Sequence, residues 1–451
     1  MPFLNNLFIK TKITEMKNIS MVFVLLIFTC SCNSQSISGY WTGTMEVNGN
    51  TADFSLDLND STISSSDNMF MKQRIQNLSL KNNILRFSYI PTDANMAFEG
   101  ILDKHNIRGA VKITRMREMP PEIKMSFNLS KQSDTSPPKK YAIEKLTVAS
   151  NGANISVEIY KPKKESIHPA ILLLHGSGGV TKNGKAFYAD YFVKQGFEVL
   201  IYDKRGSGQS TGNRITATYE NLAEDAIACL EILNKRETVD KNKIGLWAIS
   251  QGGMLLPFIA SKTDIPSFMI AISPAFSAYE AAAFSDSLRV VSRDYSSEDG
   301  YIAAESHRKV AEMIRNGSDY KEVLNFINNN AQKYPFMNLT GLHDRVVINK
   351  ENFEGLYWSG RKYNFYNYWK KLDVKTLCVF GEDDRYVDPI KTSKAIKSIK
   401  NNKIEIKIFS GANHAMKKTV NFKDFSEFDF PRVKEGYLEF VSQWIENEIE
   451  K

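Results

Sequence analysis

The sequence predicts an α/β protein: a mostly parallel, doubly wound sheet with a helical insertion, preceded by a small all-β domain. Three observations predict it. From residue 141 onward, short apolar strands alternate with helical stretches, which is typical of a parallel sheet covered on both faces. Residues 38–130 contain only short strands of alternating polarity between Asn-rich turns. Residues 245–260 form an apolar strand that ends at a serine and continues into a helix.

The N-terminal residues have the pattern of an export signal. Lysines precede the apolar run 21–28, which is too short to anchor the chain in a bilayer. We therefore expect residues 1–32 to be a signal peptide, with Met16 as an alternative start. Cys32, directly after Ser31, resembles the lipid-attachment site of bacterial lipoproteins, and Cys30 is the second candidate. The expected location is the bacterial cell envelope, periplasmic or lipid-anchored, with plain secretion as the alternative.

Composition excludes several classes of function. A chain of 451 residues with 42% hydrophobic content is long enough for two packed domains. The net charge of +7 is spread along the sequence, and the longest basic runs are pairs, so we expect no nucleic-acid partner. Cys229 and Cys378 fall on a predicted helix and a predicted buried strand, which indicates core residues. Without a Cys/His or His-x-x-x-His cluster, we expect no metal and no cofactor. The oligomeric state is left open.

The first domain spans residues 38–130. Its opening segment, Gly-Tyr-Trp-Thr-Gly-Thr at 39–44, resembles the first strand of lipocalin-like domains. Alternating strands between tight turns fit a small antiparallel barrel or a sandwich equally well. Residues 131–140 include Pro137 and Pro138 among small polar residues, so we expect an extended linker there.

The second domain spans residues 141–451, and its elements can be placed by periodicity. We expect strands at 141–148, 155–160, 170–174, 197–202, 245–249, 268–273, 376–380 and 404–409. We expect helices near 185–194 and 219–234, after the serine, at Asp388-Pro389, and at the C-terminus, ending near Ile449. Asp388 is expected to cap its helix, with proline at the first helical position.

Four motifs follow these strands. Ser250 lies in Trp-Ala-Ile-Ser-Gln-Gly-Gly, the strand–turn–helix order of a nucleophile elbow, with Ala248 where a first glycine is usual. The other motifs are His-Gly-Ser-Gly-Gly at 175–179, Asp-Lys-Arg-Gly-Ser-Gly-Gln-Ser at 203–210, and Gly-Glu-Asp-Asp at 381–384 followed by Gly-Ala-Asn-His at 411–414.

Together these motifs resemble the α/β-hydrolase superfamily over residues 141–451, in its chain order of nucleophile, acid and histidine. The resemblance is to exported esterases and serine-aminopeptidase-like members. It implies Ser250 as nucleophile, His414 as base and Asp384 as acid, with Asp383 as the alternative acid. It also implies the backbone N–H groups of Ser177 and Gln251 as oxyanion-hole donors.

The same resemblance gives the remaining residues other roles. His175 is expected to support the loop that follows its strand. Asp203 and Arg205 are expected to form a structural ion pair or loop anchor. Residues of about 275–372, rich in aromatics, are expected to be a cap that shapes the substrate pocket.

The expected function is a serine hydrolase that cleaves carboxylic esters, or amide bonds of short peptides and acylated amino acids, through an acyl-enzyme on Ser250. Its partner is a small-molecule ester or short peptide. The alternative is an inactive envelope protein that binds a ligand with the β domain and the cap pocket.

Overall fold

The computed structural model describes residues 37–90, 94–115, 123–344, 348–355, 358, 360, 363–420 and 429–450. The predicted signal peptide, with Met16, Cys30 and Cys32, lies outside these residues, so its structure is not described. Within these residues, no helix combines the length and the apolar character needed to span a membrane.

The C-terminal domain is built on one eight-stranded sheet. The strand order is β10-β11-β13-β12-β14-β15-β16-β17. β10 and β11 pair antiparallel with each other, and β11 pairs antiparallel with β13; the remaining pairs are parallel. The strands are β10 (Tyr141–Ser150), β11 (Ala153–Pro162), β12 (His168–Leu174), β13 (Glu198–Tyr202), β14 (Val239–Ile249), β15 (Phe268–Ile272), β16 (Lys375–Gly381) and β17 (Ile404–Phe409).

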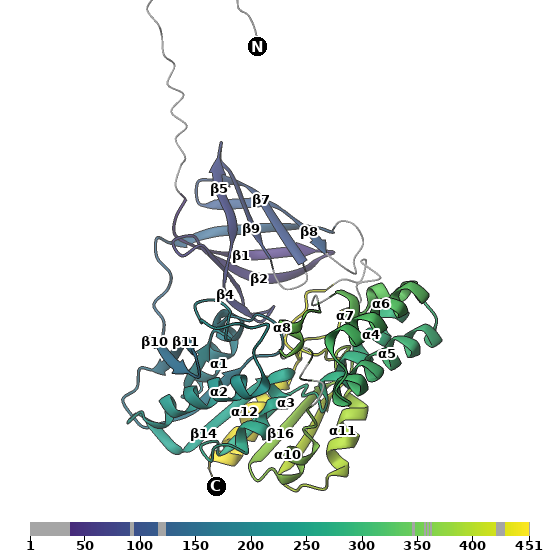
Figure 1. Ribbon diagram of the computed structural model, residues 1–451. Helices are drawn as coiled ribbons and strands as arrows, with labels where there is room; N and C mark the ends of the chain where they lie inside the picture. Colours follow the sequence, from purple (N-terminus) through teal and green to yellow (C-terminus); the bar gives the residue numbers. More distant parts are fainter. Residues whose placement is uncertain are drawn as a thin grey trace, which may run out of the picture. The chain divides into compact units, whose positions relative to one another are not determined.

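Helices cover both faces of this sheet (Figure 1). α1 (Ala186–Lys194) and α12 (Tyr437–Ile449) pack on one face, through side chains such as Phe192 and Trp444. α2 (Tyr219–Asn234), α3 (Gln251–Ala260), α10 (Tyr366–Lys371) and α11 (Pro389–Ser398) pack on the other. β13 and β15 are buried throughout and β12 at all but one residue, because each is covered on both sides. The predicted doubly wound sheet is confirmed.

The N-terminal domain is a single antiparallel sheet of nine strands in the order β4-β3-β2-β1-β9-β8-β7-β6-β5. The strands are β1 (Tyr40–Val47), β2 (Asn50–Asp57), β3 (Thr62–Ser65), β4 (Phe70–Arg74), β5 (Gln76–Lys81), β6 (Ile84–Tyr89), β7 (Ala94–Asp103), β8 (Asn106–Arg115) and β9 (Ile123–Ser133). Inward side chains such as Trp41, Phe98 and Phe127 share one core. The sheet therefore curls round its own core as in a barrel, and it is not a two-sheet sandwich.

The boundary between the domains differs from the sequence prediction. β9 extends to Ser133 because residues 131 and 133 still pair with β1. The first three residues of the predicted 131–140 linker therefore belong to the sheet, and the connection to β10 begins after them.

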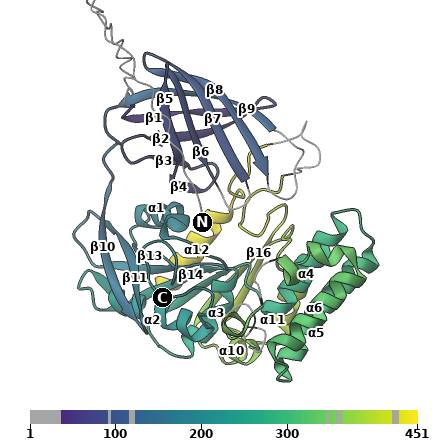
Figure 2. The ribbon, with the colours of Figure 1, turned by 45° about the horizontal axis from the view of Figure 1, so that its top comes forward.

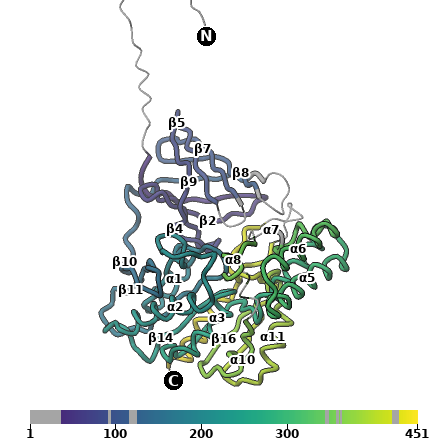
Figure 3. Tube along the Cα trace, in the orientation of Figure 1, coloured from purple at the N-terminus to yellow at the C-terminus, as the bar shows by residue number. Residues whose placement is uncertain are grey.

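The helical insertion lies between β15 and β16, as Figure 3 shows along the chain. It contains α4 (Ala278–Val291), α5 (Ser297–Arg315), α6 (Tyr320–Lys333), η2 (Pro335–Leu339), α7 (Gly341–Asp344) and α8 (Lys350–Phe353), and it leads into α10. α4, α5 and α6 form one group near α11 (Figure 2). The cap has its own core, with Val310 and Trp358 fully buried.

Candidate active site

Ser250 stands at the junction of β14 and α3 with a strained backbone. Its φ and ψ are 56° and −119°, a conformation that is rare for a residue other than glycine. The turn is tight because small residues surround it. A side chain at Gly252 would lie 2.5 Å from the carbonyl oxygen of His175, and the Ala248 methyl group is its next neighbour. The local structure is therefore the predicted nucleophile elbow, with alanine taking the place of the first glycine.

Asp384 and His414 meet at the ends of β16 and β17. His414 Nδ1 lies 2.7 Å from Asp384 Oδ2. The other carboxylate oxygen accepts hydrogen bonds from the backbone N–H groups of Tyr386 (2.7 Å) and Val387 (3.0 Å). Asp384 is buried, whereas Asp383 is exposed. Because the carboxylate is held on both oxygens, it can fix the orientation of the imidazole and stabilise its charged form.

Strand register brings these residues to the same edge of the sheet as Ser250. Ile249 is paired with Ile272, and Gly381 with Phe409, so the three loops leave neighbouring parallel strands at their carboxyl ends. Gly381 permits the close approach of the histidine loop, because a Cβ there would lie 2.4 Å from the carbonyl oxygens of Ala412 and Asn413.

The structure shows no hydrogen bond between Ser250 and His414. Within the described part of the chain, the Ser250 hydroxyl makes no hydrogen bond to His414 or to any other group. In enzymes without bound substrate, catalytic hydrogen bonds are often long or poorly aligned and tighten when substrate binds.

The two predicted oxyanion donors flank the serine. Gly176 is next to Ser250: a Cβ at Gly176 would lie 3.5 Å from the Ser250 Cβ. Gln251 is the first residue of α3, where a backbone N–H has no acceptor within the helix. Among the described residues, neither the Ser177 N–H nor the Gln251 N–H has a hydrogen-bond acceptor. Both are therefore available to a negatively charged oxygen.

The Asp203 loop anchors the segment that carries Ser177. Asp203 accepts hydrogen bonds from the backbone N–H (2.8 Å) and the ammonium (3.0 Å) of Lys182. Arg205 forms a buried two-point ion pair with Asp225, at 2.7 and 3.0 Å. Asp203 and Arg205 thus serve as loop anchors, but each has a different partner and they do not pair with each other.

His175 has no place among the reacting groups. Its side chain is buried, and its Nε2 donates to the Tyr202 carbonyl. Burial, together with the nearby charge of Lys185, lowers the pKa of His175 to about 3. Asp388 also has a structural role: its carboxylate caps α11 by accepting from the Lys391 N–H at 2.8 Å, with Pro389 as the first helical residue.

Two residues at the site escaped the sequence analysis. The ring of Tyr386 packs on the imidazole of His414, with centroids 5.1 Å apart. Lys204 reaches Gly176 and Gln251 with its ammonium group. Both lie beside residues that the motifs singled out, and this proximity was the only signal in the sequence.

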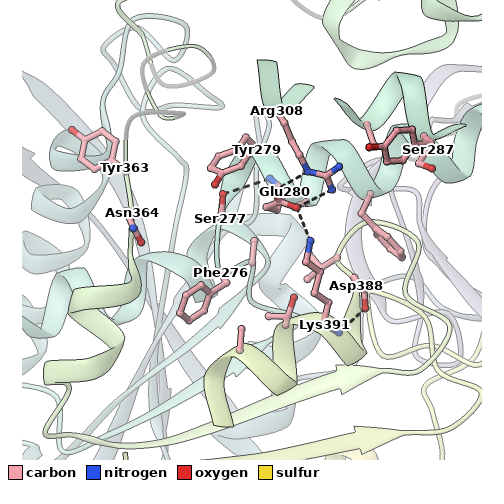
Figure 4. A pocket seen from close by; sticks show the side chains of 18 of the residues that line it. Phe276, Ser277, Tyr279, Glu280, Ser287, Arg308, Tyr363, Asn364, Asp388 and Lys391 are labelled. Carbon is pink, nitrogen blue, oxygen red and sulfur yellow. Dashed lines mark hydrogen bonds and ion pairs between the residues drawn. The ribbon is translucent and has the colours of Figure 1, made fainter. Parts of the chain in front are cut away.

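A cavity of about 680 Å³ lies between the cap and α11. Figure 4 shows Glu280 of α4 held by Arg308 of α5 and by Lys391 of α11. Aromatic side chains, among them Phe276 and Tyr279, line the remainder. Ser250, Asp384 and His414 are not in the lining, although Val387, next to the acid loop, is.

Comparisons with known proteins identify relatives of the C-terminal domain. The family described as X-Pro dipeptidyl-peptidase (S15 family) matches residues 151–415. An uncharacterized 31.7 kDa protein of Escherichia coli, from the traX-finO intergenic region, is 32% identical over 109 residues, which are 24% of this chain and 38% of that protein. The quorum-quenching protein AidA of Acinetobacter baumannii is 30% identical over 105 residues, 23% of this chain and 34% of that protein. The chain thus spans little more than a third of these curated relatives.

Solved structures resemble the chain more distantly. The hypothetical protein PA2218 of Pseudomonas aeruginosa is 16% identical, covers 69% of this chain and 95% of its own, and has a TM-score of 0.45. Est1E of Butyrivibrio proteoclasticus, solved with ferulic acid, is 17% identical, covers 68% and 100%, and has a TM-score of 0.43. At these sequence identities and TM-scores, the matches give no information about the substrate of this chain.

Proposed function

Because the chain belongs to the X-Pro dipeptidyl-peptidase (S15) family, we propose that it is a serine hydrolase that cleaves carboxylic esters through an acyl-enzyme on Ser250. That it is a hydrolase of the α/β-hydrolase class, as its motifs predicted, is confirmed by the family match. The substrate class and the roles of individual residues are the proposal. One observation supports it most: a buried carboxylate orients His414 at the sheet edge where Ser250 forms a strained elbow.

In the proposed reaction, Ser250 Oγ attacks the carbonyl carbon while its proton passes to His414 Nε2. The carbonyl oxygen becomes negatively charged and accepts hydrogen bonds from the Ser177 and Gln251 N–H groups. Asp384 holds the imidazolium through Nδ1. As the tetrahedral intermediate collapses, His414 returns the proton to the leaving alcohol. A water molecule deprotonated by His414 then hydrolyses the acyl-enzyme, which releases the acid and restores the serine.

Peptides are the second candidate substrates. The name of the matched family points to cleavage after Xaa-Pro, and the same groups can attack an amide if the leaving amine is protonated. In both cases we place the part of the substrate beyond the reacting carbonyl in the aromatic cavity under the cap (Figure 4).

A substrate panel decides between the two. We expect turnover of p-nitrophenyl esters, with a preference for one acyl length set by the cavity, and little turnover of Xaa-Pro and aminoacyl p-nitroanilides. Faster cleavage of Xaa-Pro p-nitroanilide than of every ester would favour the peptidase. Ser250→Ala should be inactive on both, and ester hydrolysis by that variant at the wild-type rate would refute the proposal.

We also propose that the protein is exported and attached to the membrane through Cys32. The support is the N-terminal sequence alone. Metabolic labelling with radioactive palmitate should mark the wild-type protein but not a Cys32→Ser variant. Labelling that persists in Cys32→Ser and disappears in Cys30→Ser would move the attachment site to Cys30.

A further inference from the structure

Lys204 is a buried lysine whose position the proposed reaction leaves unexplained. Its side chain is almost fully buried. Its ammonium nitrogen lies 2.9 Å from the carbonyl oxygen of Gly176 and 2.7 Å from Oε1 of Gln251. Neither acceptor is a carboxylate, although a buried lysine is normally paired with an acid. The neighbouring Asp203 is bonded to Lys182 instead. The energetic cost of burying Lys204 suggests that its position serves the site.

The contact with Gly176 controls the direction of the Ser177 N–H. The two groups belong to one peptide unit, which is planar and trans, so its C=O and N–H point in opposite directions. A hydrogen bond that holds the Gly176 oxygen on the Lys204 side therefore keeps the Ser177 N–H on the other side. If this peptide rotated, its oxygen would replace the N–H and the donor would be lost.

The contact with Gln251 ties the second donor residue to the same group. Gln251 comes directly after Ser250 and begins α3, while Gly176 follows β12. Lys204 thus bridges two segments that are 75 residues apart in the chain. Its own backbone is held as well, since its N–H donates to the Val180 oxygen at 3.1 Å and its carbonyl accepts from the Ser207 N–H at 2.9 Å.

We propose that Lys204 is a positioning residue that clamps the oxyanion hole by holding the Gly176–Ser177 peptide and the Gln251 side chain in their active arrangement. This inference rests on the proposed serine hydrolase function and extends it. Lys204 does not touch the substrate, and it acts through the two backbone donors.

The clamp does not depend on the charge of the lysine. Burial, together with the charge of Arg214, lowers the pKa of Lys204 to about 7. Near neutral pH, both the charged and the neutral forms are therefore present. A neutral amine still has two N–H donors, which is the number that Gly176 and Gln251 require.

The test compares Lys204→Met with Lys185→Met. Lys185 is a matched control because it is also buried, burial likewise lowers its pKa to about 7, and its ammonium lies over the Trp247 ring at 4.8 Å, with no hydrogen bond to Gly176 or Gln251 among the described residues. The measurements are kcat and KM for the best p-nitrophenyl ester, inhibition by a trifluoromethyl ketone, which forms a tetrahedral adduct with an active serine, and the thermal unfolding midpoint.

For Lys204→Met we expect kcat to fall by ~10- to 100-fold, which is less than the loss of a donor itself, while KM changes by less than about threefold. The inhibition constant of the ketone should rise in parallel. Lys185→Met should keep kcat within about threefold of the wild type, even if its thermal unfolding midpoint shifts as far as that of Lys204→Met. Gln251→Leu should lower kcat less, and its effect should not add to that of Lys204→Met.

The outcomes separate the inference from the function on which it rests. An active wild type with kcat unchanged in Lys204→Met would overturn the clamp alone. So would a loss of kcat without a loss of ketone affinity, because the lysine would then act elsewhere. If the Lys204→Met protein does not fold, the kcat and ketone affinity of Gln251→Leu decide: a parallel fall of both supports the clamp, and no change in either overturns it. A folded wild type that neither hydrolyses an ester nor binds the ketone would overturn the proposed function, and the clamp with it.

Discussion

The molecule contains two histidine–aspartate pairs that look alike and have different surroundings. His414 and Asp384 lie at the carboxyl edge of the sheet, 2.7 Å apart, and the His414 side chain is 17% exposed. His307 of α5 and Asp286 of α4 lie inside the cap, 2.5 Å apart, and the His307 side chain is fully buried. Asp286 is also held by Arg289 at 2.8 Å and by the Gly341 N–H at 2.5 Å.

The difference shows that a short contact between histidine and aspartate does not by itself indicate catalysis. The cap pair connects α4, α5 and the start of α7, so it stabilises the cap. The sheet-edge imidazole is partly exposed, and it follows β17 at the same edge of the sheet as the elbow serine. Position relative to a nucleophile and to solvent, and not the contact distance, distinguishes a base from a structural histidine.

The largest effect should separate the two histidines. His414→Gln should lower kcat by on the order of 10^6-fold, because the proposed acceptor of the serine proton is lost. His307→Gln should keep kcat within about threefold and lower the free energy of unfolding by about 1–3 kcal/mol, because a buried partner of Asp286 is lost. Steady-state kinetics and urea unfolding of both variants measure this. If His414→Gln and His307→Gln lost kcat equally, the distinction between a catalytic His414 and a structural His307 would be wrong.

The next effect compares two adjacent acids. Asp384→Asn should lower kcat by about 10^4-fold, because an amide cannot stabilise the imidazolium and favours the wrong tautomer. Asp383→Asn, the matched control, should change kcat by less than about threefold, since Asp383 is exposed. Kinetics of the two variants on one ester test the choice of acid. The reverse order would assign the role to Asp383.

A smaller effect concerns the stability of the cap in acid. Burial alone would raise the pKa of Asp286, but the hydrogen bond and charge of His307, with Arg289 and the Gly341 N–H, lower it below its ordinary value of 3.8. A carboxylate with a lowered pKa stabilises the fold above pH 3.8, and this contribution is lost as pH falls through the pKa in the folded state. Protection factors for amide hydrogen exchange in α4 and α5, which are corrected for the slower intrinsic exchange in acid, should therefore fall below pH 4. Unchanged protection down to pH 3 would contradict this.

The smallest predicted effect concerns the Asp388 cap of α11, which lies next to the loop that carries Asp384. Asp388→Ala should lower the free energy of unfolding by about 1 kcal/mol through loss of the α11 cap, whereas Asp388→Ser should restore most of it. Urea unfolding monitored by circular dichroism measures both variants. A lower kcat of Asp388→Ala, measured where this variant is fully folded, would instead place Asp388 at the site.

Local signals predicted the elements well. The strand at 404–409 and the helix at 219–234 have the predicted bounds, because apolar periodicity and capping residues act over a few positions. The elbow could be predicted for the same reason, because the small residues that permit its tight turn lie next to Ser250 in the chain. The choice between a barrel and a sandwich could not be made, since alternating strands look the same in both.

Contacts between segments that are distant in the chain could not be predicted from the sequence. Nothing near Lys204 shows that it is buried, because its acceptors come from two loops far along the chain. The separate partners of Asp203 and Arg205 escaped for the same reason. The cap pair of His307 and Asp286 is similar: both residues lie on amphipathic helices, and only the packing of α4 on α5 brings them together.

The most direct measurement is labelling of the full-length protein with a fluorophosphonate, followed by peptide mass spectrometry. The proposal predicts one adduct, on Ser250, that is absent from Ser250→Ala and forms far more slowly in His414→Gln. A folded protein that takes up no label, or that carries the label elsewhere and keeps it in Ser250→Ala, would contradict the catalytic assignment and favour a binding role.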